Sequence, residues 1–333
     1  MNRTLEHILP RVQKPARYTG GEYNAVVKDR RAVDVRYALC FPDTYEIGMS
    51  NLGVRILYGL MNEMDGVWCE RVFAPWGDME EEMRREGIPL YGLESGDSIA
   101  DFDLIGFSLG YEMAYTNVLN MLDLAGLPLR SGERTELSPI VVAGGTCAFN
   151  PEPLAPFVDL FVLGEGEDVS VEIIQLYRQA REEGWGKEEF LTAAARIPGV
   201  YVPSLYEVSY HGDGTVAAVT PLEGAPARVT KRIVQDFDKS YFPVKTIVPS
   251  TEIVHDRDAH RDCLDIVRAH PGVRGVFHCY SGSLEDAKVL VDKGWMLSFT
   301  GNITFKNARR APDILRWLPL DRLMLETDAP YMA

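Results

Sequence analysis

The feature of this 333-residue chain that most limits its fold is a regular alternation of short apolar segments with segments of helical spacing. Five apolar segments of strand length occur in the first half of the chain, at residues 35–40, 67–73, 104–109, 139–143 and 157–163. Helical segments follow them, so the order strand-then-helix repeats. This order predicts an α/β fold with a parallel sheet covered by helices.

The sequence predicts four helices after these strands, one irregular region before the first strand and one after the last helix. The helices are expected at residues 52–61, at 78–86, in a segment that places Met113, Val118, Met121 and Leu122 on one face, and from the loop 164–167 to about Arg181. Residues 1–30 predict a polar lead-in that wraps over the domain formed by residues 31–185. Residues 186–245 predict a β-rich connector with a hairpin turn at 211–214.

The loops that follow the strands are the candidates for ligand binding, because ligands of parallel sheets lie beyond the carboxyl ends of the strands. The chain places short polar side chains and glycines there. The candidate residues are Asp43, Tyr45, Gly48, Ser108, Leu109, Gly144 and Gly145. Each type also has an ordinary structural use: an aspartate caps turns and helices, and a glycine pair suits a tight strand exit.

These loop residues resemble the D-x-H-x-x-G, S-x-L and G-G motifs of cobalamin-binding Rossmann-like domains. The resemblance extends over residues 1–257 to the amino-terminal part of a bacterial family of radical SAM proteins, through segments 20–24, 41–50, 73–80, 115–122 and 150–155. It implies a cobalamin slot, but Tyr45 stands where the cobalt-ligating histidine would be. The family's C-x-x-x-C-x-x-C motif is absent from the sequence, so no iron–sulfur cluster and no radical chemistry are expected.

The carboxy-terminal residues 246–333 repeat the strand-then-helix order on a smaller scale. Strands are expected at 252–255, 275–279, 296–299 and 323–325, with three helices between them and a helix cap at Ser283. Four such units suit a partial, half-sized (β/α)8 barrel of the TIM type. His255, His278 and Asp328 lie at carboxyl ends of these strands, where a barrel would bring them together. Two imidazoles and a carboxylate suit a divalent metal such as Zn²⁺, Mg²⁺ or Mn²⁺.

Segments 254–260, 277–283, 298–301 and 320–331 resemble the carboxy-terminal half of the TatD family of metal-dependent hydrolases, typically deoxyribonucleases. The resemblance implies that His255, His278 and Asp328 are metal ligands and that Asp328 also orients the attacking water as a catalytic residue. The family's H-x-H strand and its mid-barrel glutamate should precede His255. Residues 1–254 hold no H-x-H, only the isolated His7 and His211, and the sequence stops before the family's final helix.

The distribution of charged residues changes at residue 255, close to the boundary between the two resemblances. The whole net charge of −15 falls in residues 1–255, whereas residues 256–333 hold 11 basic and 11 acidic side chains. The acidic part argues against binding of a phosphate backbone there. The start of the sequence has no apolar signal core and no membrane-length apolar run occurs, so a cytoplasmic protein without a membrane partner is expected. The five scattered cysteines are expected to be buried free thiols.

Residues 254–257 fit both family patterns, which is what recombination, or faulty joining of DNA reads, would leave behind. The chain is therefore interpreted as a chimera. The first hypothesis is a radical SAM-type cobalamin-binding-like module fused to an incomplete TatD-type hydrolase with little or no turnover. The second is a metal-dependent nuclease acting on DNA, with its barrel completed by self-association. The third is a non-catalytic interaction scaffold.

Overall fold

A computed structural model describes residues 3–235, 240–248, 260–272, 274–277, 280–300, 303 and 310–325. The chain divides into two compact units, Met1–Thr251 and Glu252–Ala333, which are treated separately below. Within the described residues, no helix is long and apolar enough to cross a membrane.

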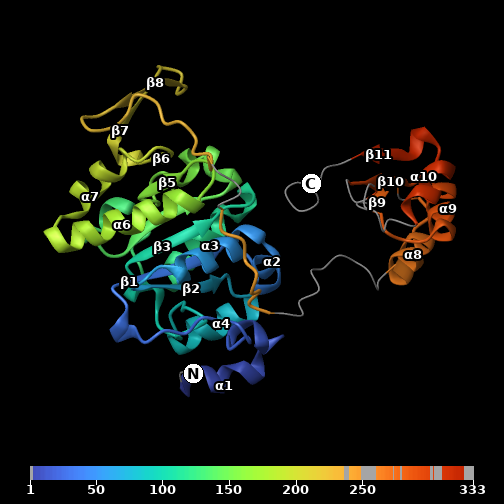
Figure 1. The fold of residues 1–333 in the computed structure, drawn as a ribbon, viewed down its shortest axis with the longest axis horizontal. Helices are drawn as coiled ribbons and strands as arrows, with labels where there is room; N and C mark the ends of the chain where they lie inside the picture. Colours follow the sequence, from blue (N-terminus) through green and yellow to red (C-terminus); the bar gives the residue numbers. More distant parts are fainter. Residues whose placement is uncertain are drawn as a thin grey trace. The chain divides into compact units, whose positions relative to one another are not determined.

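The first unit is built on a six-stranded sheet with the strand order β2-β1-β3-β4-β5-β6 (Figure 1). The strands are β1 (Val35–Phe41), β2 (Val67–Phe73), β3 (Leu104–Ser108), β4 (Ile140–Gly144), β5 (Leu160–Val162) and β6 (Val200–Tyr201). Strands β1 to β5 are parallel, and β6 pairs antiparallel with β5. The predicted α/β class is confirmed, and the sheet, predicted to be parallel, is parallel except for β6.

Helices cover both faces of this sheet, because its central strands are apolar on both sides. Alternate residues of β1 enter different cores: Ala38 and Cys40 join one, and Tyr37 and Leu39 join the other. The first core also contains residues of α1 (Arg3–Ile8), α4 (Gly77–Glu86) and α5 (Tyr115–Leu124). The second contains residues of α3 (Leu52–Glu63), α6 (Glu167–Glu183) and α7 (Lys187–Ala194).

Three details of the first unit differ from the sequence prediction or add to it. The predicted polar lead-in contributes apolar anchors, because Leu5, Ile8 and Val12 are buried in the first core. Met113 precedes α5 and is 82% exposed, so its predicted place on the buried helix face is wrong. Helix α7 and strand β6 belong to the sheet and its cover, although they lie in the segment that the sequence analysis assigned to a connector.

The predicted hairpin is present as β7 (Tyr206–Tyr210) and β8 (Val216–Pro221), which pair antiparallel beside the main sheet (Figure 1). Three free cysteines of the first unit, Cys40, Cys69 and Cys147, are buried as expected.

The second unit holds a three-stranded parallel sheet with the order β11-β10-β9. Its elements are α8 (His260–Ala269), β9 (Val276–Phe277), α9 (Leu284–Asp292), β10 (Met296–Phe299), α10 (Ala311–Trp317) and β11 (Leu323–Leu325). The predicted cap is confirmed, since the Ser283 hydroxyl accepts a hydrogen bond from the Asp286 amide at 3.0 Å. The strand expected at 252–255 lies outside the described residues.

Candidate functional site

The loops at the carboxyl ends of β1, β3 and β4 meet at one edge of the sheet, as their sequence positions predict. Asp43 accepts hydrogen bonds from its neighbour's amide, Thr44, at 2.7 Å and from the Tyr111 hydroxyl at 2.9 Å. The Thr146 hydroxyl donates to the Gly110 carbonyl at 3.1 Å. These bonds tie the first loop to the second and the second to the third.

Four of the predicted site residues, Ser108, Leu109, Gly144 and Gly145, lie where the backbones at the ends of β3 and β4 pack closely together. Ser108 stands opposite Gly144 in the β3–β4 register, and the Leu109 amide donates to the Gly144 carbonyl at 2.7 Å. Gly145 has φ 101°, and a Cβ there would lie 2.6 Å from the Leu109 carbonyl oxygen. Only glycine tolerates this backbone. Leu109 itself is buried, so these residues close the strand ends against each other.

Gly48 and Tyr45 lie in α2 (Tyr45–Ser50), directly after β1. A Cβ on Gly48 would lie 2.2 Å from the Phe73 ring, so this glycine permits the helix to pack on β2. The Tyr45 ring meets the same Phe73 edge-on at a centroid distance of 5.3 Å. The Tyr45 hydroxyl donates to the Glu22 carboxylate at 2.7 Å.

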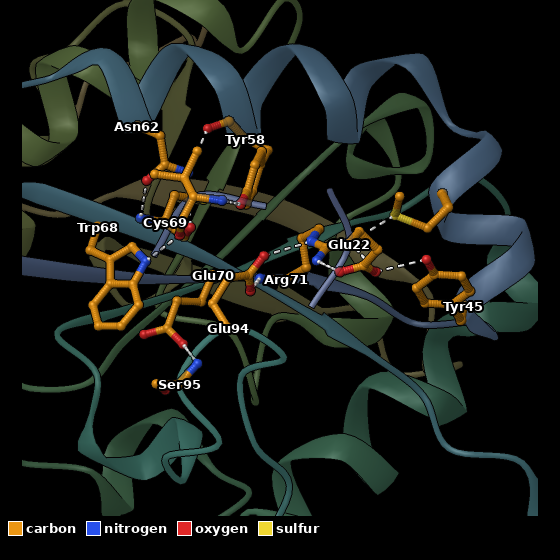
Figure 2. A network of polar contacts seen from close by, with 12 residues as sticks. Glu22, Tyr45, Tyr58, Asn62, Trp68, Cys69, Glu70, Arg71, Glu94 and Ser95 are labelled. Carbon is orange, nitrogen blue, oxygen red and sulfur yellow. Dashed lines mark hydrogen bonds and ion pairs between the residues drawn. The ribbon is translucent and has the colours of Figure 1, made fainter. Parts of the chain in front are cut away.

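That hydrogen bond is one end of a buried ionic network (Figure 2). Arg71, in the middle of β2, donates from both terminal nitrogens to Glu22 at 2.8 and 2.6 Å. Its Nε donates to Glu94 at 2.7 Å, and its backbone amide donates to the other oxygen of Glu94 at 2.8 Å. Arg71 and Glu94 are fully buried. The guanidinium is therefore shared between two carboxylates from separate loops.

A second ion pair lies on the other side of β2. Arg36 contacts Glu70 at 2.5 Å, and both side chains are almost fully buried. The Ser95 amide donates to Glu70 at 2.9 Å, so the loop that carries Glu94 is held by both pairs (Figure 2). The network positions the lead-in and the 93–97 loop against β2.

Burial and charge set the protonation of these groups. Burial raises the pKa of Glu22, but its bonds from Arg71 outweigh burial and the net pKa is lowered. For Glu94, burial outweighs Arg71, so its pKa is raised. Burial and the Glu22 carboxylate together raise the pKa of Tyr45 well above its ordinary value. The Tyr45 phenol therefore keeps its proton at neutral pH and donates a hydrogen bond to Glu22.

These residues do not fit a corrinoid that is ligated by the protein. The position expected for a cobalt ligand holds a neutral phenol whose proton is committed to a carboxylate. The glycines expected to line the slot are in contact with Phe73 and with the Leu109 backbone.

The predicted metal ligands His255, His278 and Asp328 all lie outside the described residues. In the sequence, strand β9 ends one residue before His278, and β11 ends three residues before Asp328. Among the described residues, no group of three His, Cys, Asp or Glu side chains could hold a metal ion.

The sequence analysis did not select Glu22, Arg71 or Glu94. A signal for the network was present, because Glu70 and Arg71 interrupt a strand that is otherwise largely apolar. Adjacent charges in a strand buried on both faces require partners.

Comparison with known proteins gives two separate matches. The family model "Radical SAM proteins, N-terminal" matches residues 53–203, and "TatD related DNase" matches residues 250–333. The uncharacterized metal-dependent hydrolase YcfH of Escherichia coli strain K12 is 47% identical over 83 residues, which are 24% of this chain and 31% of that protein. YabD of Bacillus subtilis strain 168, also named a metal-dependent hydrolase, is 39% identical over 24% of this chain and 32% of its own length.

A putative deoxyribonuclease TATDN1 homolog of Encephalitozoon cuniculi is 39% identical over 23% of this chain and 27% of its own length. The chain thus spans about a third of the length of these curated relatives. A solved TatD family hydrolase from Entamoeba histolytica aligns with a TM-score of 0.22 and 15% identity over 73% of this chain and 67% of its own, which is too weak to bear on the fold. The chain therefore joins a radical SAM amino-terminal domain at residues 53–203 to a TatD-related DNase region at residues 250–333.

Proposed function

We propose that the chain is a fusion of a non-radical binding module with an incomplete TatD-type hydrolase that has little or no turnover. One observation carries this proposal: the matching segment spans only 31% of its relative YcfH, and the residues before it supply no H-x-H motif.

The fold of the first unit supports the view that it does not replace the missing part of a barrel. Its sheet is open and ends in an antiparallel strand, β6, at one edge. A (β/α)8 barrel closes through parallel strands. The β9–β11 sheet with α8 to α10 is the part of the chain that we assign to a half-barrel.

The proposed metal site consists of His255, His278 and Asp328. Two imidazoles and one carboxylate form a donor set that suits zinc, and manganese or magnesium remain open. A bound divalent ion would supply Lewis acidity and lower the pKa of water. Asp328 would orient the water. Without the H-x-H strand and the glutamate, these three residues lack the partners that fix their geometry, and a misplacement of about 1 Å can cost roughly 100-fold in rate.

Metal content tests the site directly. Purified full-length chain is expected to hold less than one tightly bound ion, and that ion should be lost in His278→Ala. His270→Ala is the matched control, because His270 is exposed and lies outside the proposed donor set. A metal content that does not differ between these two variants would contradict the assignment.

Degradation of single-stranded DNA with Mg²⁺, Mn²⁺ or Zn²⁺ tests turnover. We expect a rate at least about 100-fold below that of an intact family member. Cleavage within about tenfold of the intact enzyme, abolished by Asp328→Ala, would refute the proposal of little turnover.

A second candidate is a nuclease whose barrel is completed by another copy of the chain. Exposed apolar residues on the outer strands favour it: Val276 on β9 and Met324 and Leu325 on β11. Such exposed strand residues are typical of surfaces that pair with another chain. DNA cleavage that appears only in a dimeric fraction and is lost in Leu325→Lys would support this candidate. Purified protein that binds no metal ion would instead favour a non-catalytic scaffold.

A further inference from the structure

A cavity of about 640 Å³ lies away from the loops described above, near the amino ends of β4 and β5. Its walls come from four segments: residues 131–135, residues 152–158, the start of α7, and the chain that leads from β6 into β7. Apolar side chains form much of the lining, namely Val158, Leu191, Pro203 and Val208 among others. Its volume lies within the usual range for binding pockets.

The β7–β8 hairpin extends this apolar lining outward. Its register pairs Val208 with Val219. After a shift of the register between Ser209 and Tyr210, it pairs Tyr210 with Val216, so cross-strand pairing places these four side chains on one face. The other face carries Ser209 opposite Ala218. Val208 also lines the cavity, so the apolar face and the cavity form one continuous surface. We name this surface, which consists of the cavity lining together with Tyr210, Val216 and Val219, the hairpin groove.

The outer part of the hairpin groove is open to solvent. Tyr210 is 64% exposed, Val216 is 56% exposed and Val219 is 50% exposed. In Figure 1 the hairpin extends from the sheet, with its tip away from the other elements of the first unit. An isolated two-stranded hairpin with an exposed apolar face is only marginally stable, so a covering partner would stabilise it.

The two cations that line the cavity, Arg134 and Lys187, are already neutralised or saturated. The Lys187 ammonium donates to the carbonyls of Ser131 and Arg134 at 2.8 and 2.6 Å and contacts Asp159 at 2.7 Å. Arg134 shares the same buried Asp159. Both side chains are held in the floor, where they fix the shape of the groove and are not presented to a ligand.

Most exposed charges around the cavity are negative, namely those of Glu133, Glu152, Glu188 and Glu189. One exposed cation, Arg130, precedes the first segment and lies over the Phe157 ring. None of these carboxylates forms an ion pair with a basic side chain in the part of the chain that the structure describes, and Glu152 accepts only a hydrogen bond from Tyr201 at 2.7 Å. An apolar groove with a mainly acidic rim complements an apolar ligand surface that is flanked by positive charge.

From this complementarity we propose that the hairpin groove docks a basic amphipathic helix of a partner protein. The apolar face of the helix packs on Val219, Tyr210 and the cavity, and its Lys and Arg side chains lie over the acidic rim. Helix-in-groove recognition uses this combination of apolar anchors and flanking charge. Nucleic acid is excluded as a partner here, because the rim repels phosphates.

The test uses a fluorescein-labelled peptide of about 18 residues, long enough to form a helix, with Leu and Trp on one face and Lys on the other. A second peptide carries Glu in place of every Lys. Fluorescence anisotropy with the full chain should give saturable binding of the Lys peptide at micromolar concentrations. The Glu peptide should bind at least about tenfold more weakly, which corresponds to about 1.4 kcal/mol.

Two neighbouring substitutions on β8 separate docking on the groove from general attraction to an acidic protein. Val219→Glu and Ala218→Glu add the same charge, but Val219 lies on the apolar face and Ala218 on the opposite face. Val219→Glu should weaken binding of the Lys peptide about tenfold or more, and Ala218→Glu should leave it unchanged or slightly tighter. The variant Glu133→Gln/Glu152→Gln/Glu188→Gln, two of whose residues line the cavity, should weaken it about tenfold. Equal effects of the two β8 variants, equal binding of both peptides, or no saturation below about 1 mM would overturn the proposal.

Discussion

Replacing Arg71 by Met removes the cation that two buried carboxylates share. The side chains of Glu22 and Glu94 are 11% and 0% exposed, so neither carboxylate can be solvated without a local opening of the fold. Three side-chain hydrogen bonds of 2.6–2.8 Å are lost, and two negative charges remain buried together. Breaking a buried pair in this way costs about 3–5 kcal/mol, which is a large part of the stability of a typical domain.

The pH dependence of this loss follows from the pKa shifts. In the wild type the lowered pKa of Glu22 contributes stability above its ordinary value of 4.5, and that contribution is lost as the pH falls through the folded pKa. Without Arg71, burial raises the pKa of both carboxyls, so the penalty is complete above the raised values and is relieved as the pH falls toward 4.5. The deficit of Arg71→Met should therefore be largest near pH 8 and smaller near pH 5.

Urea titration of the full chain, followed by tryptophan fluorescence, measures this effect, because Trp68 lies in the same strand as Arg71. The matched control is Arg71→Met combined with Glu22→Gln and Glu94→Gln, which removes the charges together with the cation. It should recover most of the lost stability. A loss below about 1 kcal/mol for Arg71→Met, or a triple variant as unstable as the single one, would refute the electrostatic reasoning.

Three further outcomes are expected. Gly145→Ala should destabilise the first unit by at least about 2 kcal/mol in the same urea assay, whereas Gly144→Ala, whose Cβ would find its nearest neighbour at 3.6 Å, should cost less than about 1 kcal/mol; equal costs would contradict the backbone argument. Limited trypsin digestion should remove the second unit, Glu252–Ala333, and leave the first unit, and a protease-resistant tail would speak against this order of stability. Anaerobic reconstitution with iron and sulfide should give no four-iron absorbance, and a cluster that cleaves S-adenosylmethionine would overturn the expectation.

The strands were predictable because their apolar runs end at clear breaks. Residues 67–73, 296–299 and 323–325 were predicted with the bounds that β2, β10 and β11 have in the structure. Glycine, proline or charged residues flank these runs, so local pattern suffices to locate them. The meeting of the loops after β1, β3 and β4 followed from the parallel order alone.

The use of the predicted site residues was harder to foresee. Tyr45 and Gly48 were selected as possible ligand contacts, but both pack on Phe73, and Tyr45 bonds to Glu22. Glu22 and Arg71 are 49 residues apart, and no periodicity links such positions. The lead-in seemed polar because its apolar residues are scattered, yet Leu5, Ile8 and Val12 converge in the folded chain. Local sequence patterns locate strands and helices, whereas the contacts between side chains that are distant in the sequence depend on tertiary packing.

The position of the join determines which of the two parts keeps a complete core. Asn24 of the lead-in donates to the carbonyls of Ile247 at 3.1 Å and Thr246 at 2.8 Å, so the last segment of the first unit is bonded back to its beginning. Ile247 itself is buried in the second core of that unit. The TatD-related match begins at residue 250, shortly after Ile247. A join there leaves both cores of the first unit whole, whereas the TatD-related region corresponds to only 31% of its relative YcfH. The described part of that region buries a single, smaller apolar cluster, from Leu264 to Leu318. Thermal unfolding and proteolytic cleavage should therefore begin in the TatD-related region. Substitutions in the first unit that lie outside its two cores should not change this order.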